Sequence, residues 1–345
     1  MSILSVNNLH VEFATYGGNI HAVRGVDLLL EHQQTLAIVG ESGCGKSVTV
    51  QAIMGLIPTP PGRITNGSVK LHECELIGLN ENELNRIRGK EIGMIFQDPM
   101  TSLNPTMTVG KQVGETLITH LGLDKTIAKA QAIKLLERVQ IPEAKSRIDA
   151  YPFQLSGGMR QRVMIAMAIA CKPAILIADE PTTALDVTVQ AQILKLLADL
   201  QRENGMAIIL ITHDLGVVAQ MAQQVAVMYG GQIVEQASVD DIFYRPAHPY
   251  TIGLRAARPR TSEGVKNKLA PIAGSPPDLF NPPSGCAYAA RCPHVMQLCV
   301  NQPPPLWLVT PKHQSRCWLH HSLAKANRPQ TLFTQNLISE GASVS

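Results

Sequence analysis

A glycine-rich run that ends in lysine and serine has the residue types needed to hold the phosphates of a nucleotide. Its eight positions match the pattern G-x-x-x-x-G-K-[ST] in full: Gly40, Glu41, Ser42, Gly43, Cys44, Gly45, Lys46 and Ser47. Glycines let the backbone turn so that N–H groups point at phosphate oxygens, and a helix that starts there adds partial positive charge. We expect Lys46 to reach the β- and γ-phosphates and the Ser47 hydroxyl to bind Mg²⁺.

Two adjacent carboxylates, Asp179 and Glu180, follow four apolar residues at 175–178. Such a run predicts a short strand that is covered on both faces of its sheet. We expect Asp179 to hold Mg²⁺, directly or through water, and Glu180 to polarise the attacking water as a general base. Together with the glycine-rich run upstream, the pair predicts hydrolysis of a nucleoside triphosphate.

Alternating strands and helices must position these groups. Strand-forming residues occupy 4–13, 22–30 and 35–39, and apolar residues recur at helical spacing over 46–57. A cluster of prolines and glycines at 58–67 predicts a loop.

Later segments repeat the alternation. Helices are expected at 110–140, 159–170 and 187–202, and buried strands at 174–178 and 207–212. This order predicts an α/β fold around a parallel sheet.

Charge and proline content divide the chain near residues 245–255. Residues 1–245 hold 20 Lys and Arg against 24 Asp and Glu, whereas residues 246–345 hold 10 against 3, and 14 of the 23 prolines lie in the second part. No apolar run approaches the roughly 20 residues that span a bilayer, and the first residues lack the basic start of a signal peptide. We therefore expect a cytoplasmic protein whose seven cysteines form no structural disulfides.

A second candidate anion site precedes the acidic strand. In the segment Leu155-Ser156-Gly157-Gly158-Met159, the serine and the two glycines would expose backbone N–H groups at the start of a helix. The segment resembles the LSGGQ signature of ATP-binding-cassette (ABC) ATPases, with Met159 where glutamine is common.

Further segments resemble ABC motifs and occur in the family's order. Gln97, within 95–99, resembles the Q-loop glutamine that senses Mg²⁺ and the γ-phosphate. Ala184-Leu185-Asp186 resembles the D-loop, and His213 resembles the switch histidine that contacts the γ-phosphate and orients the water. These resemblances imply that Glu180, His213 and Gln97 are catalytic and that Ser47, Gln97 and Asp179 hold Mg²⁺.

The family resemblance implies an α/β P-loop NTPase cassette with a RecA-like parallel core sheet, an antiparallel β subdomain and an α-helical signature subdomain. It also implies that two cassettes pair head to tail, with each ATP between one subunit's phosphate loop and the other's signature. An aromatic near the N-terminus would stack on the adenine. Phe13 and Tyr16 are both candidates, and we favour Tyr16.

The sequences of segments 96–105 and 178–192 resemble the corresponding segments of the dipeptide/oligopeptide importer ATPases. The sequence of 245–251 resembles the segment that leads into their C-terminal extension. This resemblance implies an ATP-hydrolysing subunit that powers peptide import. Its implied partners are a second, different ATPase subunit, two integral membrane permease subunits and an extracytoplasmic peptide-binding protein, with no nucleic acid. The subunit would lie peripherally on the cytoplasmic face of the bacterial inner membrane, and residues 98–115 would receive the permeases' coupling helices.

The predicted domains are a cassette at 1–250, a small Cys-rich C-terminal extension at 251–322 and a disordered tail at 323–345. Four cysteines fall within the extension: Cys286, Cys292, Cys299 and Cys317. In a cytosolic chain they suggest a metal site. The resemblance favours a [4Fe–4S] cluster, and zinc or free thiols are the alternatives. Cys44 lies within the phosphate loop, so we also expect sensitivity to thiol reagents.

Two other functions compete with the importer. A soluble ABC ATPase that acts on nucleic acid or the ribosome would use the basic C-terminal region for binding, but this region lacks interleaved basic and aromatic residues. A small P-loop kinase would leave the signature segment unexplained. Co-isolation with membrane subunits would separate the importer from both.

Overall fold

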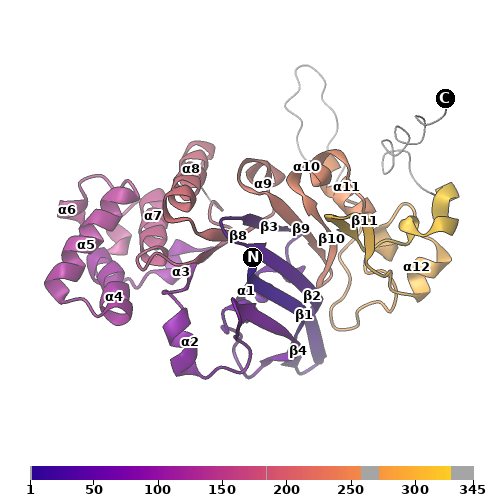
Figure 1. Cartoon of the computed structure of the whole chain (residues 1–345), viewed down its shortest axis with the longest axis horizontal. Coiled ribbons are helices and arrows are strands. Elements are labelled where there is room, and N and C mark those ends of the chain that lie inside the picture. Colours follow the sequence, from indigo (N-terminus) through magenta and orange to yellow (C-terminus); the bar gives the residue numbers. More distant parts are fainter. Residues whose placement is uncertain (1, 184, 258–271, 328–345) are drawn as a thin grey trace, which may run out of the picture.

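Two sheets and a group of helices make up the computed structural model, which describes residues 2–183, 185–257 and 272–327 (Figure 1). The larger sheet has eight strands in the order β11-β12-β10-β9-β3-β8-β7-β6. Its strands are β3 (Thr35–Val39), β6 (Ile92–Ile95), β7 (Ile175–Asp179), β8 (Ala207–Thr212), β9 (Gln224–Tyr229), β10 (Gln232–Ser238), β11 (Trp307–Thr310) and β12 (His313–Ser315). The five strands from β9 to β6 are parallel, whereas β10, β11 and β12 pair antiparallel.

Alternate residues of β7 and β8 face two different apolar cores, as the period of a strand requires. Leu176 and Leu210 join a core that includes α7 (Gly157–Ala168) and α8 (Val187–Asn204). Ile177 and Ile209 join a core on the opposite face, which includes α1 (Lys46–Ile53) and the second sheet. Because both faces are covered, the predicted apolar strands are confirmed as central strands of the sheet.

The second sheet is antiparallel and has the strand order β2-β1-β4-β5. Its strands are β1 (Ser2–Thr15), β2 (Gly18–Glu31), β4 (Gly62–Leu71) and β5 (Cys74–Glu75). The expectation of a loop over 58–67 was wrong in its second half, because β4 begins at Gly62. Pairing of Phe13 on β1 with Gly62 recruits this segment into the sheet despite its glycines.

The helical part of the chain lies at the left of Figure 1. It contains α4 (Val109–Leu121), α5 (Lys125–Arg138), α6 (Ala144–Arg147) and α7. The single helix expected at 110–140 is in fact two, because Gly122 ends α4 in a left-handed conformation and Asp124 caps α5 by accepting from the Thr126 N–H group. Shorter helices are α2 (Glu81–Ile87), α3 (Pro99–Ser102), η1 (Pro152–Gln154) and α9 (Leu215–Met221).

The chain beyond residue 238 packs against the sheet instead of forming a separate body, because β12 pairs with β10 and β11 extends the same sheet. Its helices are α10 (Val239–Tyr244), α11 (Pro249–Ala256), η2 (Ala289–Arg291), α12 (Gln297–Asn301), η3 (Trp318–His320) and η4 (Ser322–Asn327). The predicted extension is therefore continuous with the core sheet. Most of the predicted tail, 328–345, lies outside the described residues.

Within the described ranges, no helix is both long and apolar enough to cross a membrane.

Candidate functional site

The predicted phosphate loop joins the end of β3 to the start of α1. Gly43 and Gly45 have φ angles of 78° and 105°, which L side chains rarely adopt. A Cβ atom on Gly45 would lie 2.4 Å from the carbonyl oxygen of Ala22, and one on Gly40 would lie 2.2 Å from that of Met228. Glycine at 40 and 45 thus lets the loop lie directly against the neighbouring strands.

Lys46, the first residue of α1, is buried, with 6% of its surface exposed. Its ammonium group donates to the carbonyl oxygens of Gly40 and Glu41, each over 2.9 Å. The lysine therefore crosses the inside of the loop. Cys44 is also buried, and burial raises the pKa of its thiol although the Lys46 charge opposes the rise. This argues against the expected sensitivity to thiol reagents, since the thiolate is the reactive form.

The two predicted Mg²⁺ ligands Ser47 and Asp179 are brought together. The Ser47 hydroxyl donates to Asp179 Oδ1 over 3.1 Å, which connects α1 to the end of β7. Burial raises the pKa of Asp179, the Ser47 hydrogen bond opposes the rise, and the neighbouring Glu180 charge adds to it. A hydroxyl and a carboxylate in contact are oxygen donors of the type that Mg²⁺ prefers, so these residues fit the ion.

Glu180 is the meeting point of the other predicted catalytic residues. Gln97 Nε2 donates to its Oε2 over 3.2 Å, and His213 Nδ1 lies 3.3 Å from its Oε1. The backbone of Glu180 has φ 47°, and its N–H group donates to Ile211 O over 3.0 Å. The side chain is partly buried at 15% exposure, which keeps it at the site edge but within reach of water.

Sequence reasoning missed Thr183. Its hydroxyl donates to Glu180 Oε2 over 2.8 Å, so the carboxylate has contacts with three side chains. The three-residue separation of Thr183 from Glu180 was the available signal, because a turn follows β7 and returns the hydroxyl to the carboxylate.

The signature segment lies apart from the phosphate loop: α7 belongs to the helical part, and α1 lies near the centre of Figure 1. Ser156 caps α7 by accepting from the Met159 N–H group, and a Cβ atom on Gly157 would meet nothing within 4 Å. Leu155 is buried and anchors the segment. The surface of the segment at Gly157 is therefore open.

Asp186, from the predicted D-loop, caps α8 by accepting from the Val189 N–H group over 2.9 Å. Ala184 of the same motif lies outside the described residues.

The two aromatic candidates for adenine stacking differ in exposure. Phe13 packs against the apolar core beneath the antiparallel sheet, whereas Tyr16 is fully exposed in the turn between β1 and β2. An exposed ring has a free face on which a base could stack, which favours Tyr16.

The four cysteines of the C-terminal region line one small cavity of about 10 Å³. Burial raises the pKa of the Cys292 thiol to about 11 and also raises the pKa of the Cys286 and Cys317 thiols. His248 lines the same cavity, and its Nε2 atom is buried without a hydrogen-bond partner. However, nowhere in the described chain do three or more His, Cys, Asp or Glu residues form a group that could hold a metal ion. The expected metal centre is therefore not formed by this arrangement.

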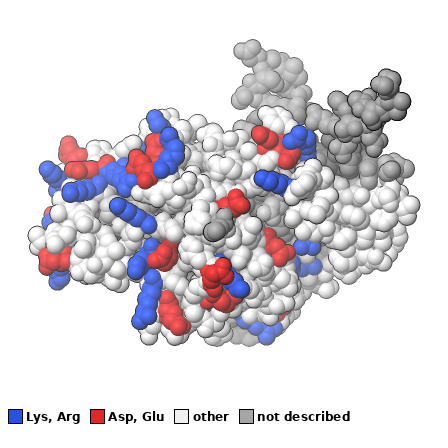
Figure 2. Space-filling model, in the orientation of Figure 1, with Lys and Arg blue, Asp and Glu red and all other residues white. Residues whose placement is uncertain are grey.

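Charges on the face shown in Figure 2 are mixed, with Lys and Arg interspersed among Asp and Glu over the cassette. The C-terminal region, at the right, is mostly uncharged on this face. Of its basic residues, Arg291 is buried against Glu41. Among the residues of this region that the structure describes, the visible face shows no continuous basic patch.

Comparison with known proteins gives two family matches. The family "ABC transporter" matches residues 23–183, and the family "Oligopeptide/dipeptide transporter, C-terminal region" matches residues 234–299. Among curated relatives, the "Oligopeptide transport ATP-binding protein OppD" of Bacillus subtilis (strain 168) is 54% identical over 327 residues, covering 95% of this chain and 91% of the relative. The "Dipeptide transport ATP-binding protein DppD" of the same organism is 53% identical, with 94% and 96% coverage.

Solved structures show a similar fold. The ATP-binding cassette MJ0796, described as dimeric and bound to ADP and Pi in a post-hydrolysis state, is 29% identical to this chain with a TM-score of 0.62. The match covers 68% of this chain and 98% of that structure.

Proposed function

The chain belongs to the ATP-binding proteins of the oligopeptide/dipeptide ABC importers, and we propose that it hydrolyses ATP at the phosphate loop through Glu180. It is the ATPase subunit that powers peptide import, as the sequence predicted. The cassette fold is likewise confirmed, with a mixed core sheet in place of a wholly parallel one. The single observation that carries the catalytic proposal is the convergence of Gln97, Thr183 and His213 on the Glu180 carboxylate.

We propose a separate role for each residue of the site. The Lys46 ammonium and the N–H groups of the 40–47 loop hold the phosphates, except for the Glu41 N–H group, which donates to the Tyr250 hydroxyl. Glu180 accepts a proton from the attacking water. Bound Mg²⁺, held by Ser47, Asp179 and Gln97, would neutralise charge on phosphate oxygens. His213 orients the water and contacts the γ-phosphate. Tyr16 stacks on the adenine.

The signature segment acts on a second cassette in this proposal. Leu155 and Ser156 fix the start of α7, and the open face of Gly157 approaches the ATP bound by the partner subunit. The partner is proposed to be a different polypeptide, so that each ATP lies between two subunits. Asp186 lies close to that interface in the proposal, at the start of α8.

Family membership implies permease and binding-protein components in the assembled importer. We propose two permease subunits whose coupling helices dock on residues 98–115. A cavity of about 600 Å³ between α4 and α5 supports this, since Met107, Gly110 and Lys111 line one of its walls. The subunit would then lie peripherally on the cytoplasmic face of the inner membrane.

The segment boundaries are proposed as they were drawn from the sequence: a cassette at 1–250, an extension at 251–322 and a tail at 323–345. Support for a boundary close to residue 250 comes from the break between α10, which ends at Tyr244, and α11, which begins at Pro249.

An iron–sulfur cluster at the four cysteines remains a proposal. Support comes from the single small cavity that all four cysteines line. Against it, the described side chains form no metal-holding group, so the thiols would have to move closer together. Iron and sulfide analysis of anaerobically purified protein tests this, with zinc analysis in parallel. Absence of both metals would leave the cysteines as free thiols.

Reconstitution tests the main proposal. The complete importer, with its peptide-binding protein, should show ATP hydrolysis that rises when peptide is added and that requires an intact Lys46. A rate of ATP hydrolysis that is unchanged by peptide but changes when RNA is added would instead favour the nucleic-acid ATPase. RNA should then bind the protein less tightly as the salt concentration is raised.

A further inference from the structure

Glu41, the second residue of the phosphate loop, is held at both its backbone and its side chain. Its N–H group donates to the Tyr250 hydroxyl over 2.9 Å. Its carboxylate accepts two hydrogen bonds from Arg291, over 2.6 and 2.9 Å. Tyr250 lies on α11 and Arg291 ends η2, so both contacts come from the chain beyond the last strand of the cassette.

Arg291 is a buried cation whose hydrogen-bonding capacity is fully used. Its side chain is 4% exposed, and a guanidinium has five N–H donors. Two donate to the Glu41 carboxylate and one to the Tyr229 hydroxyl. The other two donate to the carbonyl oxygens of Ile272 and Ala273. The guanidinium is therefore fixed in one orientation, and the Glu41 carboxylate supplies its compensating charge.

The acceptors that surround Arg291 connect three parts of the molecule. Tyr229 ends β9, and its ring lies 5.7 Å from Arg291 Cζ. The carbonyl oxygen of the preceding Met228 is the atom that excludes a side chain at Gly40. Arg291 thus links the C-terminal region, the central sheet and the first turn of the phosphate loop.

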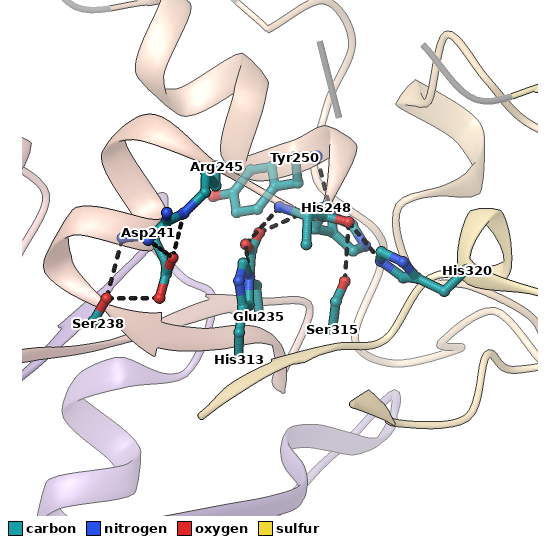
Figure 3. Close-up of polar contacts among 10 residues, drawn as sticks. Glu235, Ser238, Asp241, Arg245, His248, Tyr250, His313, Ser315 and His320 are labelled. Carbon is teal, nitrogen blue, oxygen red and sulfur yellow. Dashed lines mark hydrogen bonds and ion pairs between the residues drawn. The ribbon is translucent and has the colours of Figure 1, made fainter. Parts of the chain in front are cut away.

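A second buried network places Tyr250 (Figure 3). The Glu235 carboxylate accepts from the N–H groups of Ala247 and His248, over 2.6 and 2.9 Å, and lies 2.7 Å from His313 Nε2. His248 in turn accepts from the Tyr250 N–H group through Nδ1 over 3.1 Å. Because Glu235 and His313 are almost fully buried, the start of α11 is held tightly against β10 and β12.

We infer that the C-terminal region positions the phosphate loop for nucleotide, and that Arg291 is a positioning residue that acts through Glu41. This rests on the proposed function of the 40–47 loop. The backbone N–H groups of that loop must point at phosphate oxygens, so a change in the Glu41 backbone weakens both ground-state and transition-state binding. Glu180, Gln97 and His213 are held by other elements and retain their geometry. Loss of the Arg291 contact should raise KM for ATP much more than it lowers kcat.

The test uses the complete importer with this chain carrying Arg291→Gln, Glu41→Gln or both. We expect each single variant to raise KM and the Kd of Mg-ATP about tenfold, the loss of roughly one charge-assisted hydrogen bond, with kcat within threefold of wild type. The double variant should be no worse than either single one, because the two residues share one interaction. Arg291→Lys keeps the charge and should recover part of the affinity.

Arg316→Gln is the matched control. Arg316 lies in the same region and pairs with Asp27 at 3.6 Å, away from the phosphate loop. Its loss should leave KM unchanged. Tyr250→Phe gives a second route if Arg291→Gln fails to fold, because it removes only the acceptor for the Glu41 N–H group. It should also raise KM.

Three results would overturn the inference: an unchanged KM in Arg291→Gln and Tyr250→Phe, KM increases that multiply in the double variant, or an equal KM increase in Arg316→Gln. Lys46→Ala in the same assay distinguishes failure of the inference about Arg291 from failure of the proposed nucleotide site. If Lys46→Ala binds ATP normally, the loop itself is not the nucleotide site.

Discussion

The Ser47 hydroxyl donates to the Asp179 carboxylate over 3.1 Å, although 132 residues separate them in the chain. This contact joins the helix after the phosphate loop to the strand that carries both acidic residues. The proposed phosphate-binding loop and the proposed base therefore follow β3 and β7, two parallel strands that are separated by β8 alone, since β8 pairs with both of them.

Lys46→Ala should abolish ATP binding and turnover. The lysine supplies the positive charge inside the loop, where burial strengthens its attraction for phosphate. Binding of a fluorescent ATP analogue and phosphate release by the complete importer measure the effect. Lys195→Ala, at an exposed position on α8, is the control and should behave as wild type. Equal ATP affinity in both variants would contradict the proposed role of Lys46.

Glu180→Gln should retain Mg-ATP but lose hydrolysis by roughly 10²- to 10⁴-fold, the usual contribution of a positioned general base. The amide keeps the size of the side chain but cannot take a proton from water. Rapid-quench assays and nucleotide retention after gel filtration measure the two effects. Glu137→Gln, exposed on α5, should change neither. If Glu180→Gln hydrolyses ATP within a few-fold of wild type, another residue is the base.

Gly157→Ala should leave stability unchanged but reduce ATP hydrolysis by the assembled importer by at least about tenfold, because in the proposed pair of cassettes the added methyl group would face the other subunit's nucleotide. A Cβ atom there meets nothing within 4 Å in this subunit. Thermal unfolding of the isolated chain and ATPase assays of the complex measure the two quantities. A lower melting temperature with normal activity would show that Gly157 stabilises the fold of its own subunit and does not contact a nucleotide bound by another.

Cys44 should react with N-ethylmaleimide at least about tenfold more slowly than Cys74 at pH 7.5. Burial raises the pKa of the Cys44 thiol, so little thiolate is present, whereas Cys74 is exposed. Because Cys44 reacts as the thiolate, its rate should rise as pH increases through 9. Peptide mass mapping at timed intervals follows both sites. Faster labelling at Cys44 would mean that the loop opens often enough to expose it.

The sequence predicted the parts of this molecule that depend on local pattern. The phosphate loop, the acidic strand and the capped helix at Ser156 each have their chemistry within about ten consecutive residues, and the structure places each on the expected element. The broken helix at Gly122 was missed because apolar spacing continues on both sides of it.

Contacts between distant segments were not predictable in the same way. Arg291 and Glu41 are 250 residues apart, and nothing in the residues around Arg291 indicates its partner. The pairing of β12 with β10 was also missed, because a three-residue strand among prolines has too short a pattern to detect. Spacing alone could not establish the metal centre, since four cysteines can share a cavity without forming a metal-holding group.

The most direct test is a structure of the complete importer with Glu180→Gln in this chain and Mg-ATP present. The account predicts density for the triphosphate against residues 40–47, with Ser47 and Asp179 beside the metal and the signature segment of the other cassette over the γ-phosphate. Triphosphate bound elsewhere on this chain, or held in the loop with no second cassette facing it, would contradict the account.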